Sequence, residues 1–295
     1  MFIFSTDAYQ DFTKKLVKQA RLKYGRLTIK KFADGEIYVK VKEKVAGQNV
    51  FVVGTTAPPS DNLVEFLLLC QALTLAKVKS ITAVLPYLGY ERADRLKEAG
   101  EAVSAKLVAD LLKFSQVKKI IALDLHSQRV VNFIKEDIKL VHLSAIEILA
   151  AAIKRENLKK IIVVAPDNGA LTGAKKLAKF LSCGVAWMEK FRPRHNVACV
   201  RKLYGDVQGK QAVIFDDMID TAGTICQAVC CLREAGAKKI LVAATHGIFS
   251  GPAIGRLRQA PISIVFVTDS VLISQKKRIK KIRIVPVTSL LSKNL

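Results

Sequence analysis

Short apolar runs alternate along the chain with longer segments in which apolar residues recur every three or four positions. Seven of the runs are continuously apolar and rich in β-branched residues, which is typical of strands buried on both faces of a parallel sheet. These predicted strands are residues 49–54, 80–86, 119–124, 160–166, 211–217, 239–245 and 262–268. Helical periodicity fills residues 60–77 and 143–156 between them. The alternation predicts an α/β fold with mostly parallel sheets.

The length of the chain and the spacing of these elements indicate two domains. A chain of 295 residues is long enough for two. We place the boundary near residues 142–144, which predicts domains of residues 1–143 and 144–295. A coarse repetition accompanies this division, because an apolar strand ends in an Asp-containing loop near residue 124 and again near residue 216.

Polar loops, most of them containing Gly, follow five of the predicted strands. Ligands of open α/β sheets bind at the carboxyl ends of the strands, so these loops predict a built site. The five segments are PYLGYERADR (86–95), DLHSQ (124–128), PDNGALTG (166–173), DDMIDTAGT (216–224) and THGIFSGPA (245–253).

The composition favours a soluble, cytoplasmic protein. Hydrophobic residues make up 51% of the chain, yet no apolar run reaches the roughly 18 residues needed to span a membrane. The first four residues are apolar, but the polar residues that follow are unlike those of a secretory leader. The six cysteines form no CxxC pair and lie in apolar or helical runs, as buried, reduced thiols do. The four histidines show no HExxH spacing, which argues against structural zinc.

The formal net charge is +23, from 48 Lys and Arg residues against 25 Asp and Glu residues. Such a charge attracts polyanions, either nucleic acid or phosphate-rich small molecules. The basic residues are spread along the chain, although QKKRIKKIR (275–283) concentrates six of them. A lysine-rich solvated surface explains this spread better than nucleic-acid binding does. Aromatic residues make up only 7% of the chain and do not alternate with basic ones to form a stacking platform.

The segment VIFDDMIDTAGT (213–224) places three carboxylates beside a turn of small residues. Thr221, Ala222 and Gly223 let backbone N–H groups approach a ligand closely. The helix expected from Thr224 adds unpaired N–H donors and the positive end of its dipole. A phosphate monoester fits this turn, with the two threonine hydroxyls as further donors.

The carboxylates of Asp216, Asp217 and Asp220 repel phosphate, so they need a different partner on the same ligand. Vicinal sugar hydroxyls donate hydrogen bonds that carboxylates accept, and a ribose 5-phosphate carries both kinds of group. A divalent cation between acids and phosphates is a second explanation. Helix capping is a third, although a single Asp would be enough for it.

This segment resembles the phosphoribosyl pyrophosphate-binding loop that phosphoribosyltransferases share with ribose-phosphate pyrophosphokinases. Motifs along nearly the whole chain are similar to those of the pyrophosphokinase family and follow its order. They are KFADGEIYVKV (31–41), DNLVEFLLLCQAL (61–73), ITAVLPYLGYERADR (81–95), SAKLVADLL (104–112), LDLHS (123–127), VVAPDNGA (163–170), EKFRPRHN (189–196), GDVQGKQAVIFDDMIDTAGT (205–224) and HGIFSGPAI (246–254). The resemblance implies two phosphoribosyltransferase-like domains, each with a mostly parallel sheet flanked by helices. It also implies transfer of the diphosphoryl group of ATP to the anomeric hydroxyl of ribose 5-phosphate, leaving AMP.

The resemblance assigns the ribose 5-phosphate site to the Asp-rich segment. It implies that Asp216 and Asp220 hold the ribose hydroxyls, with Asp217 in the same site. The 5-phosphate cradle that it implies consists of Asp220, Thr221, Ala222, Gly223 and Thr224.

By the same resemblance, Lys190 and Arg192 in EKFRPRHN are the catalytic residues, and Arg192 also contacts the sugar phosphate. The stretch has no clean helical period, so we expect a loop that closes its cations over the diphosphoryl group. An ordinary basic surface loop is the alternative that the residues alone leave open.

His126 and Asp167 match positions that bind magnesium or its water shell in the family, so Mg²⁺ is the implied cofactor. Magnesium prefers oxygen ligands, which makes Asp167 the stronger candidate.

Two further segments match the family's ATP contacts. The residues concerned are Asp34, Gly35, Glu36, Arg92, Ala93 and Asp94. A plain turn is the alternative explanation for the first three. Because the family builds its adenine site with a neighbouring subunit, the resemblance also implies a homo-oligomer that is built from dimers and can be a hexamer.

The chain departs from the family in four respects. Ala93 stands where the family has Gln, and LKEAGEAV (96–103) replaces the basic, Pro-containing stretch that usually follows. ALTGA (170–174) replaces a run with a second Gly and an Arg, and the chain is shorter than many members. We therefore expect an active enzyme with altered regulation or nucleotide selectivity.

Three other functions stay open at this point. A non-catalytic regulatory paralogue is disfavoured by the presence of Lys190, Arg192, His126 and Asp167. A phosphoribosyltransferase acting on a nucleobase is disfavoured by the N-terminal segments DGE and ERADR. A nucleic-acid binder has only the net charge in its favour.

Overall fold

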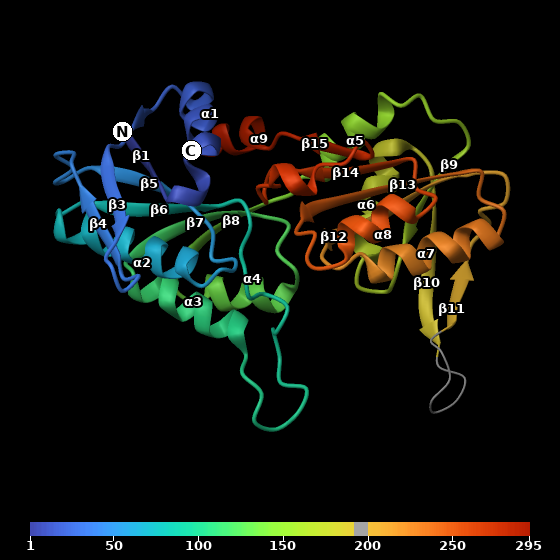
Figure 1. Ribbon diagram of the computed structural model, residues 1–295, viewed down its shortest axis with the longest axis horizontal. Helices are drawn as coiled ribbons and strands as arrows, with labels where there is room; N and C mark the ends of the chain where they lie inside the picture. Colours follow the sequence, from blue (N-terminus) through green and yellow to red (C-terminus); the bar gives the residue numbers. More distant parts are fainter. Residues whose placement is uncertain (192–199) are drawn as a thin grey trace. The chain divides into compact units, whose positions relative to one another are not determined.

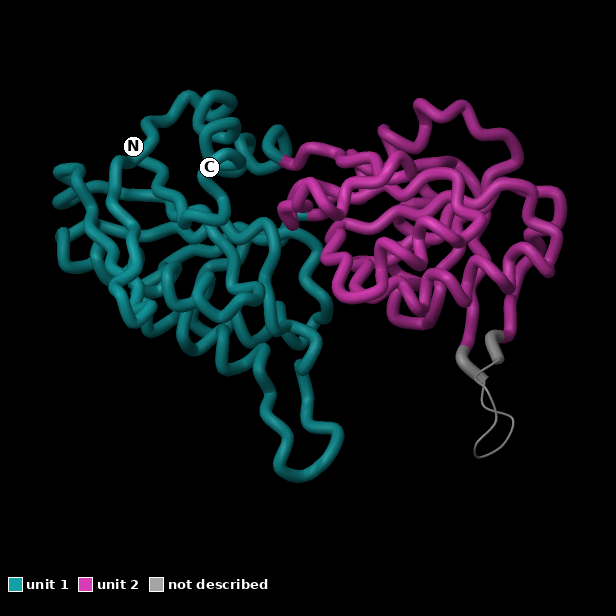
Figure 2. Tube along the Cα trace, in the orientation of Figure 1, with its two compact units in different colours: residues 1–143, 288–295 teal, residues 144–287 magenta. Residues whose placement is uncertain are grey.

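The computed structural model describes residues 1–191 and 200–295 (Figure 1). The chain forms two compact units, unit 1 with residues 1–143 and 288–295 and unit 2 with residues 144–287 (Figure 2). Residues 288–295 therefore belong to unit 1, whereas the sequence analysis assigned them to the second domain. The cause is α9 (Thr288–Ser292), which packs against α1 (Gln10–Ala20) and buries Leu291 completely.

Unit 1 is built on a six-stranded parallel sheet. In spatial order the strands are β2 (Lys23–Tyr24), β1 (Phe2–Ser5), β5 (Asn49–Val53), β6 (Ser80–Leu85), β7 (Val117–Leu123) and β8 (Lys139–Leu143). One face packs against α2 (Asp61–Leu75), α3 (Ser104–Phe114) and α4 (Gln128–Lys135). α1 and α9 lie on the other face (Figure 1). An antiparallel hairpin of β3 (Leu27–Lys31) and β4 (Ile37–Val41) contacts α2.

Unit 2 contains a seven-stranded sheet. In spatial order its strands are β11 (Val200–Tyr204), β10 (Gly184–Phe191), β9 (Ile161–Ala165), β12 (Gln211–Ile219), β13 (Lys239–Gly247), β14 (Ile264–Thr268) and β15 (Ile282–Val285). β10 and β11 pair antiparallel, and the other neighbours pair parallel.

Helices cover both faces of this second sheet. Successive side chains of a strand point to opposite faces. Ala212 and Ile214 of β12 thus pack with α7 (Gly223–Glu234) and α8 (Ala253–Gln259), while Val213 and Phe215 pack with α5 (Ile146–Lys154) and α6 (Leu171–Leu181). Burial on both sides explains the continuous apolar run that predicted this strand.

The two units share one topology. The strand order β2-β1-β5-β6-β7-β8 of unit 1 corresponds to β10-β9-β12-β13-β14-β15 of unit 2, with β11 added at the edge. The hairpin β3–β4 precedes β5 in the chain as the hairpin β10–β11 precedes β12. This equivalence pairs β12 with β5, whereas the strand that ends near residue 124 is β7, which corresponds to β14. The Asp-containing loops near residues 124 and 216 are therefore not equivalent positions in the two units.

The structure bears on two expectations from the composition, the burial of the cysteines and the lack of a membrane-spanning segment. Cys70 is buried and Cys183, Cys226 and Cys231 are partly buried, but Cys230 is exposed, so burial of every thiol is wrong. In the described part of the chain, no helix is both long and apolar enough to cross a membrane.

Candidate functional site

Each of the five polar segments lies at the carboxyl end of a parallel strand, as predicted, although residues 216–219 and 245–247 still belong to β12 and β13. Two of them follow β6 and β7, which are neighbours in the sheet of unit 1. The other three follow β9, β12 and β13, which are consecutive neighbours in the sheet of unit 2. The segments therefore form one group in each unit.

The turn between β12 and α7 is a fixed backbone structure. Ala222 has φ 60° and ψ 11°, a left-handed conformation that costs a residue with a Cβ about 1–2 kcal/mol. Its side chain is only 4% exposed and packs in the core beneath α7. Burial of the methyl group thus holds the turn in its unfavourable conformation, and α7 begins directly afterwards at Gly223.

The segment after β13 holds this turn from the protein side. The backbone N–H groups of Ile248 and Phe249 both donate to the carbonyl of Ile219, each at 3.0 Å. The N–H of Ser250 donates to the carbonyl of Asp220, also at 3.0 Å. The motif THGIFSGPA therefore supports the candidate phosphate loop through its backbone.

The carboxylates of unit 2 form an acid cluster in which ionisation of Asp216 is disfavoured. Burial, followed by the charge and hydrogen bond of Asp217 and the charge of Asp167, raises the pKa of Asp216 to about 8. One oxygen of Asp216 accepts the backbone N–H of Asp217 at 2.9 Å, which opposes the rise. Such a cluster favours a ligand that brings hydroxyl donors or positive charge.

These carboxylates suit a magnesium ion that arrives with its substrate. Among residues 1–191 and 200–295, no three His, Cys, Asp or Glu side chains meet as a metal-binding group. Mg²⁺ usually takes one or two protein carboxylates and completes its octahedron with water and phosphate oxygens. Asp167, half-buried after β9 and close enough to act on Asp216, fits that requirement.

In unit 1, two acids connect the segments after β6 and β7, the buried Glu91 and the partly buried Asp94. Glu91 is 1% exposed and its Oε2 accepts the backbone N–H of His126 at 2.9 Å. Asp94 lies 3.6 Å from the guanidinium of Arg129 at the start of α4. Burial raises the pKa of Asp94, but the hydrogen bond from Ser127 and the charge of Arg129 lower it more. The exposed His126 is thus presented by a firmly held turn.

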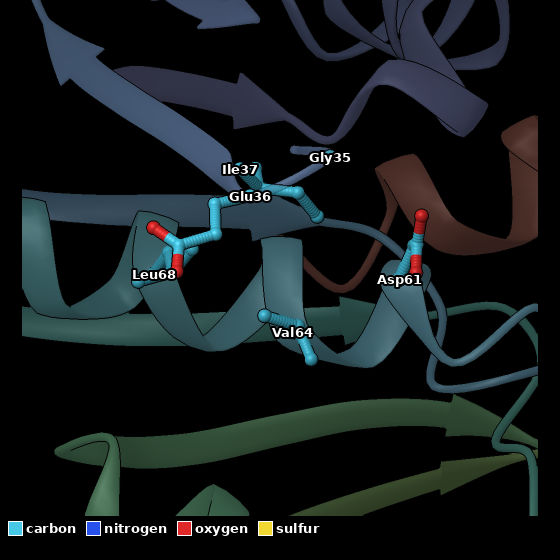
Figure 3. Close-up of a pocket in the computed structure, with 6 residues that line it drawn as sticks. All are labelled: Gly35, Glu36, Ile37, Asp61, Val64 and Leu68. Atoms are coloured by element: carbon cyan, nitrogen blue, oxygen red, sulfur yellow. The ribbon is translucent and has the colours of Figure 1, made fainter. Parts of the chain in front are cut away.

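Asp34, Gly35 and Glu36 form the tip of the β3–β4 hairpin. Asp34 Oδ1 accepts the backbone N–H of Glu36 at 3.0 Å, and Gly35 has φ 97°, a conformation that favours glycine. A cavity of about 330 Å³ lies beside this tip (Figure 3). Its lining residues are Gly35, Glu36, Ile37, Asp61, Val64 and Leu68.

The hairpin reaches the segment after β6 through the start of α2. Lys31 forms an ion pair with Asp61, and Ser60 hydrogen-bonds the hydroxyl of Tyr90 at 3.2 Å. Arg92, the predicted nucleotide contact two residues further on, has an exposed side chain. The two predicted ATP segments are therefore linked by contacts, although neither Arg92 nor Ala93 lines the cavity at the hairpin.

Comparison with known proteins identifies the family. Residues 1–115 match the family profile described as the N-terminal domain of ribose phosphate pyrophosphokinase, and residues 197–295 match a phosphoribosyl synthetase-associated domain. The ribose-phosphate pyrophosphokinase of Fusobacterium nucleatum is 40% identical over 290 residues, which covers 97% of this chain and 91% of that protein. The chain belongs to the ribose-phosphate pyrophosphokinase family.

Other members of the family agree in sequence and in fold. The ribose-phosphate pyrophosphokinase of Bacillus caldolyticus is 38% identical over 281 residues, 95% of this chain and 89% of that protein. The crystal structure of phosphoribosylpyrophosphate synthetase from Mycobacterium smegmatis matches with a TM-score of 0.92 and 34% identity. That match covers 99% of this chain and 96% of the other, which confirms the predicted fold.

Lys190, one of the two candidate catalytic residues, lies at the end of β10. The sequence predicts a loop from residue 189, but β10 continues to Phe191 and pairs Lys190 with Arg201 of β11. That expectation is wrong for residues 189–191, because pairing with β11 extends the strand. Arg192 lies outside the described residues.

Sequence reasoning missed two residues that hold these sites. Glu91 lies inside a motif of the pyrophosphokinase family, yet nothing in the motif says that its carboxylate turns inward to the His126 backbone. Arg256 of α8 lies beyond the last recognised motif and donates to the carbonyl of Thr221. A basic residue on the helix after the THGIFSGPA segment was the only signal, in a chain with many basic residues.

Proposed function

We propose that the protein is a ribose-phosphate diphosphokinase. It transfers the diphosphoryl group of ATP to the anomeric hydroxyl of ribose 5-phosphate, giving 5-phosphoribosyl 1-diphosphate and AMP. The observation that carries this proposal is the juxtaposition, after β12, of an acid cluster and a rigid turn at a helix N-terminus.

Unit 2 binds ribose 5-phosphate in this proposal. Asp216, Asp217 and Asp220 accept hydrogen bonds from the ribose hydroxyls, because an ionised carboxylate has acceptors and no donor. Thr221, Ala222, Gly223 and Thr224 donate backbone N–H groups and hydroxyls to the 5-phosphate. The sugar is thereby held at both ends, with its anomeric hydroxyl free to react.

Asp167 and His126 are the proposed residues for magnesium. Asp167 would bind the ion or its water shell directly, and the exposed imidazole of His126 would contact the water shell, because magnesium is a poor partner for nitrogen. When bound, the ion neutralises the charge of the transferring diphosphoryl group.

Asp34, Gly35, Glu36, Arg92, Ala93 and Asp94 are the proposed ATP contacts. Of these, Gly35 and Glu36 line the cavity beside the hairpin, which supports their assignment. Carboxylates at the hairpin tip accept hydrogen bonds from an adenine amino group, and an exposed Arg stacks on the ring or contacts phosphate. The homo-oligomer and the cytoplasmic location stay predictions.

Lys190 and Arg192 are the proposed catalytic residues. The reaction forms a bond between the anomeric oxygen and the β-phosphorus and breaks the bond between that phosphorus and the α,β-bridging oxygen, while the anomeric hydroxyl loses its proton. Two cations beside the diphosphoryl group would stabilise the charge on its oxygens.

The test is formation of AMP from ATP in the presence of ribose 5-phosphate and Mg²⁺. We expect AMP only when the sugar phosphate is present, and loss of turnover on chelation with EDTA with recovery on added Mg²⁺. Lys190→Ala is expected to remove most of the rate. If the wild type and Lys190→Ala are equally inactive, the protein is the regulatory paralogue instead.

A further inference from the structure

Arg256 on α8 reaches across to the candidate phosphate loop. Its Nη1 donates a hydrogen bond to the backbone carbonyl of Thr221 at 3.0 Å. A Cβ added to Gly223 would lie 3.4 Å from the same nitrogen. The guanidinium therefore rests on the backbone of the turn at the start of α7.

The geometry of the peptide unit gives this hydrogen bond a consequence on the other side of the loop. In a trans peptide, the carbonyl of one residue and the N–H of the next point in opposite directions. Arg256 holds the carbonyl of Thr221, so the N–H of Ala222 is directed away from Arg256.

The neighbouring peptide units are fixed in the same way, but by the backbone itself. The N–H of Ser250 holds the carbonyl of Asp220, and the N–H of Cys226 holds the carbonyl of Ala222, each at 3.0 Å. Because each of these carbonyls is held by a hydrogen bond, the N–H groups that follow them in the turn point away from the supporting residues. Of these three supports, the one from Arg256 comes from a side chain, and a substitution can remove it.

The charge of Arg256 also reaches the first turn of α7. Burial raises the pKa of the Cys226 thiol, and the charge of Arg256 opposes that rise. An arginine side chain stays protonated at all working pH values. It therefore adds a permanent positive charge behind a turn whose helix dipole already favours an anion.

We propose that Arg256 is a positioning residue for the phosphate of the sugar substrate. It holds the Thr221 carbonyl and thereby aims the Ala222 N–H at the phosphate. This inference rests on the proposed function, because it concerns the same ribose 5-phosphate site.

The decisive variant is Arg256→Met, which keeps a long side chain but removes the donors. Loss of a hydrogen bond from a charged donor corresponds to a change of about tenfold or more. We expect KM for ribose 5-phosphate to rise by about that factor, with KM for ATP and kcat little changed. Arg256→Lys is expected to recover much of the affinity, because it keeps the charge and a donor. Arg256→Gln, a neutral donor, should fall between the two.

Arg258→Met is the matched control. Arg258 lies on the same helix two residues further on, about 200° around its axis. Within the described residues, its side chain forms no hydrogen bond or ion pair, while its carbonyl accepts from Lys281. We expect this variant to behave as the wild type does.

Binding of ribose 5-phosphate without ATP, measured by calorimetry, separates the two levels of inference. If the wild type does not bind the sugar phosphate, the proposed function fails and this inference fails with it. If the wild type binds and Arg256→Met binds equally well, only the role of Arg256 is rejected. An equal rise of both KM values in Arg256→Met would also reject it, because that pattern indicates general distortion of the protein.

Discussion

At the residue scale, Asp216 connects ligand binding with stability. Its pKa is raised from 3.8 to about 8, first by burial and then by Asp217 and Asp167. The unfolded chain releases this proton at about pH 4, whereas the folded protein keeps it until near pH 8. The stability that Asp216 contributes is therefore complete below about pH 4 and is lost as the pH rises to 8.

Asp216→Asn should remove this pH dependence and weaken sugar binding at the same time. We expect the free energy of unfolding, measured by urea denaturation without ligands, to fall less between pH 5 and pH 8 than in the wild type. Above pH 8, where Asp216 is ionised, affinity for ribose 5-phosphate should fall by about tenfold, because charge-assisted hydrogen bonds are lost. Asp206→Asn is the control, since a hydrogen bond from Lys210 lowers the pKa of this exposed residue and its effect lies below pH 5. If the stability of Asp216→Asn depends on pH as that of the wild type does, the raised pKa of Asp216 is contradicted.

Single residues also show how much of the candidate site can be predicted from the sequence alone. The three Asp residues and the TAGT turn were recognisable because binding residue types crowd into one short segment. Glu91 and Arg256 were not, because each acts through a backbone group 35 positions away in the sequence. A bond between a side chain and a distant backbone leaves no local pattern.

At the element scale, the pattern detected those strands that are buried on both faces. All seven predicted strands are present, as β5, β6, β7, β9, β12, β13 and β14. Strands β2, β8, β11 and β15 were missed, and each lies at the edge of a sheet. The hairpin strands β3 and β4 and the interior strand β10 were missed as well. Edge strands are partly exposed and carry charges, as IRIV of β15 does, so no continuous apolar run marks them. β1 was missed because it is only four residues long.

The long connection from β6 to α3 has a structural role that a single substitution can test. It spans residues 86–103, and loops of this length in compact domains usually serve a function. Glu91 anchors the connection to the His126 turn. Outer residues that orient a metal-binding group typically contribute about tenfold or more to affinity or activity.

We therefore expect Glu91→Ala to raise KM for magnesium-bound ATP by about tenfold while KM for ribose 5-phosphate stays unchanged. Glu91→Gln retains an oxygen that accepts the His126 N–H, so it should remain near the wild type. Glu98→Ala, an exposed acid in the same connection, is the control. Steady-state kinetics in each substrate decide the matter, and equal changes in both KM values would contradict a role confined to this turn.

At the scale of the whole molecule, two units of the same topology differ in the connection that forms the candidate phosphate loop of unit 2. In unit 1 the connection equivalent to the β12–α7 turn runs from β5 to α2 and contains Pro58 and Pro59, which have no N–H to donate. The hydroxyls of Thr55 and Thr56 donate to the carbonyls of Tyr87 and Gly89 at 2.9 and 3.3 Å. The two prolines therefore offer no donor to a phosphate there, and both threonine hydroxyls already donate elsewhere.

Titration with ribose 5-phosphate should consequently give one binding site per chain. Asp220→Asn in unit 2 should weaken this site, whereas Ser60→Ala at the start of α2 should leave it unchanged. Isothermal calorimetry measures both the number of sites and the affinity. A second site of similar affinity that survives in Asp220→Asn would show that unit 1 also binds the sugar phosphate.

Unit 2 is contiguous in the chain, whereas unit 1 is completed by residues 288–295. During synthesis, the segment with Leu291 leaves the ribosome only after every residue of unit 2 has been made. Unit 2 can therefore finish folding while the core of unit 1 still lacks its last helix. Unit 1 starts first, yet its core can be completed only after all of unit 2 has been made, which is the reverse of the usual order in which domains are completed during translation.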